Sequence, residues 1–242
     1  MHTEPFQIFG AQHLITLTIA AVLILGIPFA LRNTTDTTKH TAKIVLATLM
    51  LGFEIRQISY AFEFNYGWAE AFPFHMCDLS AFALSYFFFK GGRILFNCAF
   101  FWGVGGATMA LITPDAAFAY PNPQYLPFFY SHTLLLVAVF FTLIALKARP
   151  YLSDIPKVMA VTLAGMFVIY GINFALGDGA NFWYLRAGPD AVSLMAFLPE
   201  PPFHVLAFIP LVILIFYLTY LPFWVWDRFT RSAPATHLHS ES

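Results

Sequence analysis

Seven long apolar runs, separated by short polar segments, constrain the fold of this chain more than any other feature. The hydrocarbon core of a bilayer is about 30 Å thick, and a helix of roughly 20 apolar residues crosses it. The runs lie at residues 13–31, 42–62, 72–89, 94–113, 127–146, 155–176 and 203–226. They do not alternate in polarity as the strands of a membrane β-barrel do. The sequence therefore predicts an all-α, polytopic membrane protein, a seven-transmembrane helix bundle.

The composition supports a membrane location and leaves little room for other domains. Of the 242 residues, 59% are hydrophobic and 10% are charged, a balance that a soluble domain of this length could not cover with polar surface. We expect one transmembrane domain over residues 1–228, followed by a disordered cytoplasmic tail over 229–242. The net charge of −1 offers no basic surface for nucleic acid. Membrane lipids are the expected partners, and protein partners stay open.

The basic residues predict the orientation of the bundle in the membrane. Ten of the twelve fall in the first, third and fifth connections, near the adjoining span ends, or in the tail. Lysine and arginine mark cytoplasmic loops, so we expect the N-terminus outside, the C-terminus in the cytoplasm, and a multi-pass protein of the cell membrane. The long external connection 177–202 is rich in Gly and Pro and contains an apolar stretch, 192–198. We expect a cap or re-entrant segment there.

In this orientation, the outer halves of the spans hold most of the polar and ionisable side chains. These residues are His13, Glu54, Arg56, His75, Cys77, Asp78, Asp115, His132 and Asn173. An Arg, Lys or Asp in hydrocarbon costs about 2.5–3.5 kcal/mol on insertion scales, which favours a functional role for such a cluster. The alternative is structural pairing, above all for Glu54 and Arg56. Because these two are two positions apart on a helix, each needs a partner on another helix.

Cys77 and His132 are the candidate pair for covalent chemistry. A thiol beside an imidazole becomes a usable nucleophile, and His132 lies at a matching depth. His75 and Asp78 are three positions apart, as suits a carboxylate that orients an imidazole. The alternative for Cys77 is a small buried hydrophobic residue, which is also the expectation for Cys98.

A metal site is a weaker hypothesis for the same side chains. His13, His75, Asp78 and His132 include suitable zinc ligands, but no HxxxH or HExxH pair supports the hypothesis. We therefore predict no metal and no cofactor. Arg186, a basic residue in an external connection, is expected either to bind a phosphate or carboxylate headgroup or to be solvated.

Glycine and aromatic residues have simpler expected roles. Gly103, Gly105 and Gly106 are expected to let helices approach closely. Aromatic residues at span ends are expected to anchor the protein in the membrane interface; they are Trp68, Tyr125, Trp183 and Trp226.

Four sequence blocks resemble the bacterial YwaF-like integral membrane family. They are PFHMCDLS at 73–80, FWGVGGATMALITPD at 101–115, FFYSHTLLL at 128–136 and INFALGDGANFWYLR at 172–186. That family is distantly similar to a vertebrate transmembrane acyltransferase acting on ether phospholipids, and to androgen-induced lipid hydrolases. In the acyltransferase, a membrane cysteine and a later histidine are the proposed catalytic pair, in the order of Cys77 and His132. The resemblance implies a protein of the bacterial inner membrane.

These observations predict an acyltransferase or lipid hydrolase with an outer-leaflet site. Cys77 would be the nucleophile and His132 the general base, with Asp78 or Asn173 orienting the site. The resemblance does not extend to a headgroup-binding lysine, because this chain reads Ala187 and Gly188 where the family often has Lys-Pro. One alternative is a small-solute transporter or membrane sensor subunit with a polar outer cavity, which the nearly uncharged inner halves disfavour. Another is a metal-dependent membrane hydrolase.

Overall fold

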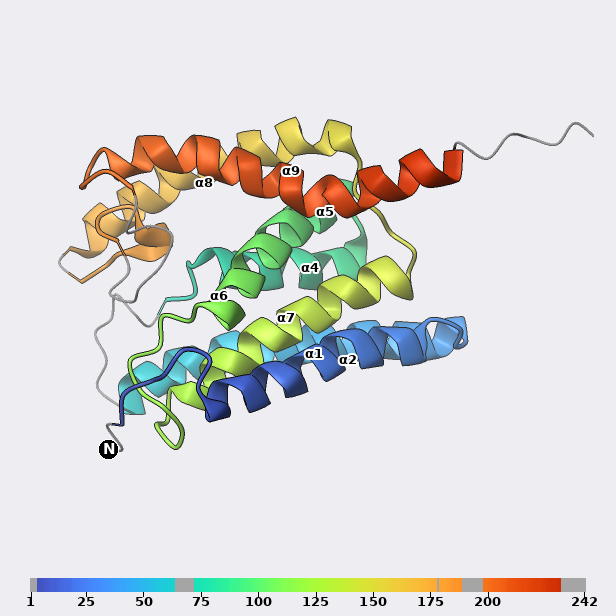
Figure 1. Cartoon of the computed structure of the whole chain (residues 1–242), viewed down its shortest axis with the longest axis horizontal. Coiled ribbons are helices and arrows are strands. Elements are labelled where there is room, and N and C mark those ends of the chain that lie inside the picture. Colours follow the sequence, from blue (N-terminus) through green and yellow to red (C-terminus); the bar gives the residue numbers. More distant parts are fainter. Residues whose placement is uncertain (1–3, 64–71, 178, 189–197, 232–242) are drawn as a thin grey trace, which may run out of the picture.

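The computed structural model describes residues 4–63, 72–177, 179–188 and 198–231, and helices fill each of the seven predicted segments. The helices are α1 (Ala11–Leu31), α2 (Asp36–Glu63), α4 (Met76–Lys90), α5 (Arg93–Trp102), α6 (Thr108–Ile112), α7 (Tyr125–Ile144), α8 (Ile155–Leu176) and α9 (His204–Arg231). Successive segments run in alternating directions along the long axis of the bundle (Figure 1). The predicted all-α architecture is confirmed over the described residues.

Within the described ranges, five helical segments are long and apolar enough to cross a membrane. They are Ala11–Leu31, Arg93–Ile112, Tyr125–Ile144, Leu152–Leu176 and His204–Thr230. Large apolar side chains on α1, α8 and α9 face outward, with Ile15, Phe167 and Phe229 exposed by 61%, 81% and 78%. Outward apolar faces suit contact with lipid chains. The count of seven spans, which would add α2 and α4, stays a prediction.

The two ends of the bundle differ in their polar contacts. We call the end with residues 4–10, 113–124 and 179–188 the N-terminal end. The opposite, basic end carries the predicted cytoplasmic connections and two ion pairs. Arg93 Nη2 lies 2.6 Å from Asp154 Oδ2, and Arg149 donates two 2.9 Å hydrogen bonds to Asp227. Whether the basic end faces the cytoplasm stays a prediction.

The predicted fourth span contains a short π-helix that the sequence did not reveal. Gly103–Ala107 adopts this conformation between α5 and α6. A Cβ on Gly105 would lie 2.8 Å from Ile215 Cγ2 of α9, and one on Gly103 would lie 3.4 Å from Val139 Cγ2 of α7. The expected packing role is confirmed for both glycines. A π-turn inside an α-helix is often found at functional sites.

Two of the expected interface anchors are buried, so that expectation was wrong for them. Trp183 is 8% exposed and its Nε1 donates to the Phe74 carbonyl oxygen at 2.8 Å. Tyr125 is 3% exposed and its hydroxyl lies 2.9 Å from that of Thr16 on α1. Trp226 is exposed as expected, and Trp68 lies outside the described residues.

At the C-terminus, α9 continues to Arg231, so residues 229–231 are helical where the tail was expected to begin. Residues 232–242 lie outside the described part of the chain, as do residues 192–197 of the external apolar stretch.

Gly105→Ala tests the close approach of α9 to the π-helix. The added methyl group meets a β-branched side chain that cannot swing away, so we expect a loss of about 1–3 kcal/mol in the free energy of unfolding. Gly171→Ala on α8 is the control, because nothing lies within 4 Å of its Cβ position. Thermal unfolding in detergent measures both. Equal melting temperatures for the two variants would contradict this packing.

Candidate functional site

A cavity of about 720 Å³ lies inside the bundle and extends to the N-terminal end. Its wall includes residues from α2, α4, α7, α8, α9 and the π-helix, and residues 115–118 beyond α6. Its volume is within the range of pockets that hold small-molecule ligands. Most of the predicted site residues line it; they are Glu54, Arg56, His75, Cys77, Asp78, Asp115 and His132.

Cys77 occupies the first turn of α4, opposite the π-helix. A Cβ on Gly106 would lie 3.6 Å from Cys77 Sγ, so the missing side chain leaves space beside the sulfur. Gly106 and Cys77 both line the cavity. Cys98 is 3% exposed within α5 and packs in the apolar core. The two thiols therefore have different surroundings, as expected.

His132 on α7 is oriented by its own helix. Its Nδ1 lies 2.7 Å from the Phe128 carbonyl oxygen. A carbonyl oxygen can only accept a hydrogen bond, so Nδ1 carries the proton and Nε2 carries the lone pair. In this tautomer Nε2 is the ring atom that can accept a proton. The backbone of Phe128 thus has the orienting role expected of Asp78 or Asn173.

Asp78, in the first turn of α4, caps the start of that helix and does not orient an imidazole. Its Oδ2 accepts a 2.9 Å hydrogen bond from the backbone N–H of His75, a contact that caps the helix. The bond reaches the His75 backbone rather than its ring. That ring packs edge-on against Phe182, with centroids 5.0 Å apart. Both residues nevertheless contribute side chains to the cavity wall.

Glu54 and Arg56 have different surroundings on α2. Arg56 Nη2 lies 3.1 Å from Glu63 Oε2, so one partner of Arg56 lies on its own helix, whereas we expected partners on other helices. The Arg56 side chain is half-exposed. Glu54 is 5% exposed, and its Oε2 has no hydrogen-bond partner among the described residues. Structural pairing, the alternative for both residues, therefore accounts for Arg56 alone.

A short segment covers the cavity at the N-terminal end, and we call Ala180–Ala187 the cap segment. Asn173 of α8 holds it through two hydrogen bonds: Nδ2 donates to the Phe182 carbonyl at 2.9 Å, and the Phe182 N–H donates to Oδ1 at 2.8 Å. The Trp183 indole packs against Gly165, where a Cβ would lie 2.8 Å from Cη2. Asn173 thus supports the cavity from outside its lining.

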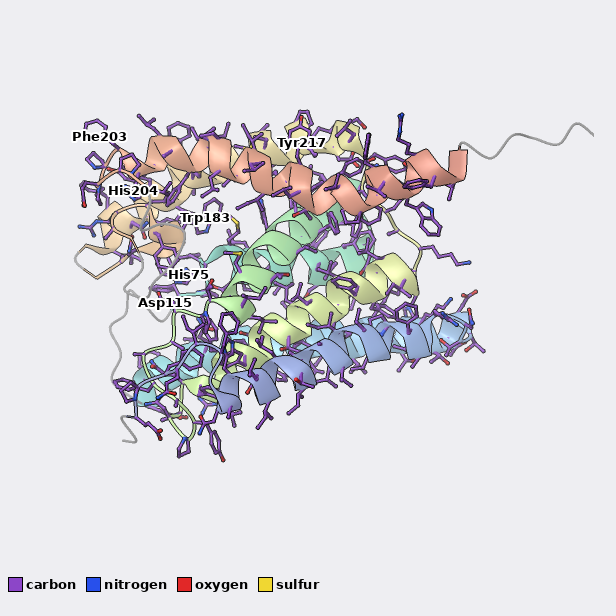
Figure 2. The ribbon with its side chains drawn as sticks, in the orientation of Figure 1. His75, Asp115, Trp183, Phe203, His204 and Tyr217 are labelled. Atoms are coloured by element: carbon purple, nitrogen blue, oxygen red, sulfur yellow. The ribbon has the colours of Figure 1, made fainter. Side chains whose placement is uncertain are left out.

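Two more predicted residues hold the cap segment. The Tyr184 hydroxyl donates to Asp115 Oδ2 at 2.8 Å. Arg186 Nη1 donates to the carbonyl oxygens of Asn173 and Gly177 at the end of α8. Through these contacts Arg186 caps the C-terminal end of α8. Arg186 is not among the residues that line the cavity. Figure 2 shows His75, Asp115 and Trp183 at the same end of the bundle.

Trp183 and Tyr184 line the cavity, yet they were absent from the predicted site. The only sequence signal was their place in the block INFALGDGANFWYLR, next to Arg186. An aromatic residue near a span end predicts an interface anchor equally well, so residue type alone could not identify them.

His13 is a structural residue at the start of α1. It is 1% exposed. Its Nδ1 accepts a 2.9 Å hydrogen bond from the Phe9 N–H, so its Nε2 donates to the Leu111 carbonyl at 2.8 Å. Both ring nitrogens are used. Over the described ranges, no three His, Cys, Asp or Glu side chains gather closely enough to hold a metal ion, so the metal-hydrolase alternative has no ligand set there.

Residues 8–220 match the model of the TMEM164 family. The chain belongs to the TMEM164 family. Together with the five helices that can cross a membrane, this membership makes it a multi-pass membrane protein in contact with lipids. No curated protein and no solved structure matches the chain.

Asn173→Ala tests whether this side chain holds the cap segment. The change leaves the buried N–H and carbonyl of Phe182 without partners, and each orphaned group costs about 1–3 kcal/mol. We expect a clear drop in melting temperature in detergent. Asn33→Ala, at an exposed position between α1 and α2, is the control and should change little. An unchanged melting temperature for Asn173→Ala would show that the cap segment does not depend on these bonds.

Proposed function

We propose that this protein is an acyltransferase or lipid hydrolase that acts on lipid acyl esters, with Cys77 as nucleophile and His132 as general base. One observation carries the proposal: a thiol from α4 and an imidazole from α7, distant in sequence, line the same cavity inside a membrane protein. The His132 tautomer adds support, because its Nε2 is the atom able to accept the thiol proton. The same order of residues in the YwaF-like resemblance agrees with these roles.

The reaction proceeds in two halves. His132 Nε2 takes the Cys77 proton as Sγ attacks the ester carbonyl carbon. The bond between the carbonyl carbon and the alcohol oxygen then breaks, and His132 gives its proton to that leaving oxygen. The acyl group remains on Cys77 as a thioester. In the second half His132 deprotonates a lysophospholipid hydroxyl, or water in a hydrolase. That oxygen attacks the thioester, and Cys77 leaves and regains its proton.

The surroundings of the cavity suit a lipid substrate. Aromatic and aliphatic side chains form much of its wall, among them Phe101, Phe128 and Phe208. The predicted orientation puts the N-terminal end, and hence the site, in the outer leaflet of the cell membrane. The resemblance to the YwaF-like family favours a bacterial inner membrane. A membrane phospholipid would then supply the acyl ester, and a lysophospholipid or water would be the acceptor.

A small-solute transporter or sensor subunit is the rival function. A transporter requires a polar route from the cavity to the basic end of the bundle. Among the described residues, the lining ends near the middle of the helices at apolar side chains such as Leu135 and Phe216. This arrangement favours chemistry on a bound lipid over passage of a solute.

Cysteine and histidine variants test the proposal directly. Purified protein in mixed micelles is given an isotopically labelled phospholipid and a lysophospholipid, and acyl exchange and release are followed by mass spectrometry. We expect Cys77→Ala and Cys77→Ser to lose exchange and His132→Gln to slow it by about 10²–10⁴-fold. Cys98→Ala is the matched control and should keep the activity of the parent protein. Full activity in both Cys77 variants would refute the proposed function.

A further inference from the structure

The cavity contains a carboxyl group that the described part of the protein does not satisfy. Three carboxyl side chains line it: Glu54, Asp78 and Asp115. Asp78 accepts a hydrogen bond from the His75 N–H, and Asp115 accepts one from the Tyr184 hydroxyl. Glu54, which is 5% exposed, has a buried oxygen with no hydrogen-bond partner among the described residues. A buried polar atom without a partner is uncommon and calls for a cause.

The cations available in the wall do not satisfy Glu54. Among the described residues the lining contains no lysine. Its arginine, Arg56, is half-exposed and bound to Glu63. The N–H at His132 Nδ1 donates its hydrogen bond to the Phe128 carbonyl oxygen. A ligand that brings positive charge and hydrogen-bond donors into the cavity would supply what Glu54 lacks.

We propose that the cavity binds an organic ammonium group, with Glu54 as its main carboxylate partner and Asp78 as the second. An ammonium N–H donates to carboxylate oxygens, and aromatic faces next to it add cation–π attraction. Phe53 of α2 and Trp102 of α5 supply such rings in the wall. No three potential ligand side chains gather for a metal ion over the described ranges, which favours an organic cation.

The ammonium group has two possible sources, a phospholipid headgroup or a free amine. In the first case the inference rests on the proposed function, because the headgroup belongs to the lipid whose acyl chain is exchanged. The binding itself requires no covalent step and no Cys77. Binding and acyl exchange therefore succeed or fail separately.

The test measures ligand-induced stabilisation of the purified full chain in neutral detergent. In one arm the protein is titrated with ethanolamine hydrochloride and, as the control, with sodium chloride at the same ionic strength. The other compares lysophosphatidylethanolamine with lysophosphatidylglycerol. We expect a saturable rise in melting temperature of the parent protein in at least one arm, and at least a tenfold weaker apparent affinity in Glu54→Gln. The arm that responds identifies the source of the ammonium group.

Variants separate binding from folding. Glu54→Gln keeps the shape and removes the ionisable carboxyl group, so its ligand-free melting temperature should equal or exceed that of the parent protein. Asp36→Asn, exposed at the start of the same helix, is the control and should keep full affinity. Asp78→Asn can still accept the hydrogen bond from the His75 N–H and should also weaken binding. It replaces Glu54→Gln as the test variant if Glu54→Gln does not fold. Cys77→Ala should bind normally. Equal affinity in Glu54→Gln and the parent protein, or no response in either arm, would overturn the inference.

Discussion

Hydrocarbon offers no partner to a polar group, so a protein in the membrane must satisfy its buried polar atoms itself. This requirement explains many of the contacts described above. Both ring nitrogens of His13 are bonded to backbone atoms, Asn173 makes two bonds to Phe182, and the Trp102 indole donates to the Thr162 hydroxyl at 2.8 Å. Five buried side-chain atoms in the described part of the chain lack a hydrogen-bond partner, and of their residues only Glu54 lines the cavity. Its position beside a space that can hold a ligand therefore points to function.

The two ends of the bundle serve different purposes. At the basic end, the Arg93–Asp154 and Arg149–Asp227 ion pairs join neighbouring segments. At the N-terminal end, polar contacts hold the cap segment over the cavity. The Tyr184–Asp115 bond and the Asn173–Phe182 bonds fix this segment to two different parts of the bundle. The cavity is thus kept open below a covered end, although much of the surrounding bundle is close-packed.

The positions of the helices could be predicted because membrane spans require length and apolarity, which the sequence displays directly. The depth of the site residues along each helix could be predicted from the helical rise. The direction of each side chain could not, since it depends on how neighbouring helices rotate against one another. Asn173 and Arg186 therefore proved to support the cap segment. The glycines indicated close packing, but nothing in them revealed the wider turn of the π-helix.

The proposed reaction requires Cys77 to carry an acyl group between its two halves. The most direct measurement is the mass of the intact protein after incubation with a phospholipid of defined acyl chains, followed by peptide mapping. We expect a mass increase of one acyl group, removed by neutral hydroxylamine and located on Cys77. Acylation on Cys98 instead, or no acylated protein under conditions in which acyl exchange proceeds, would contradict it.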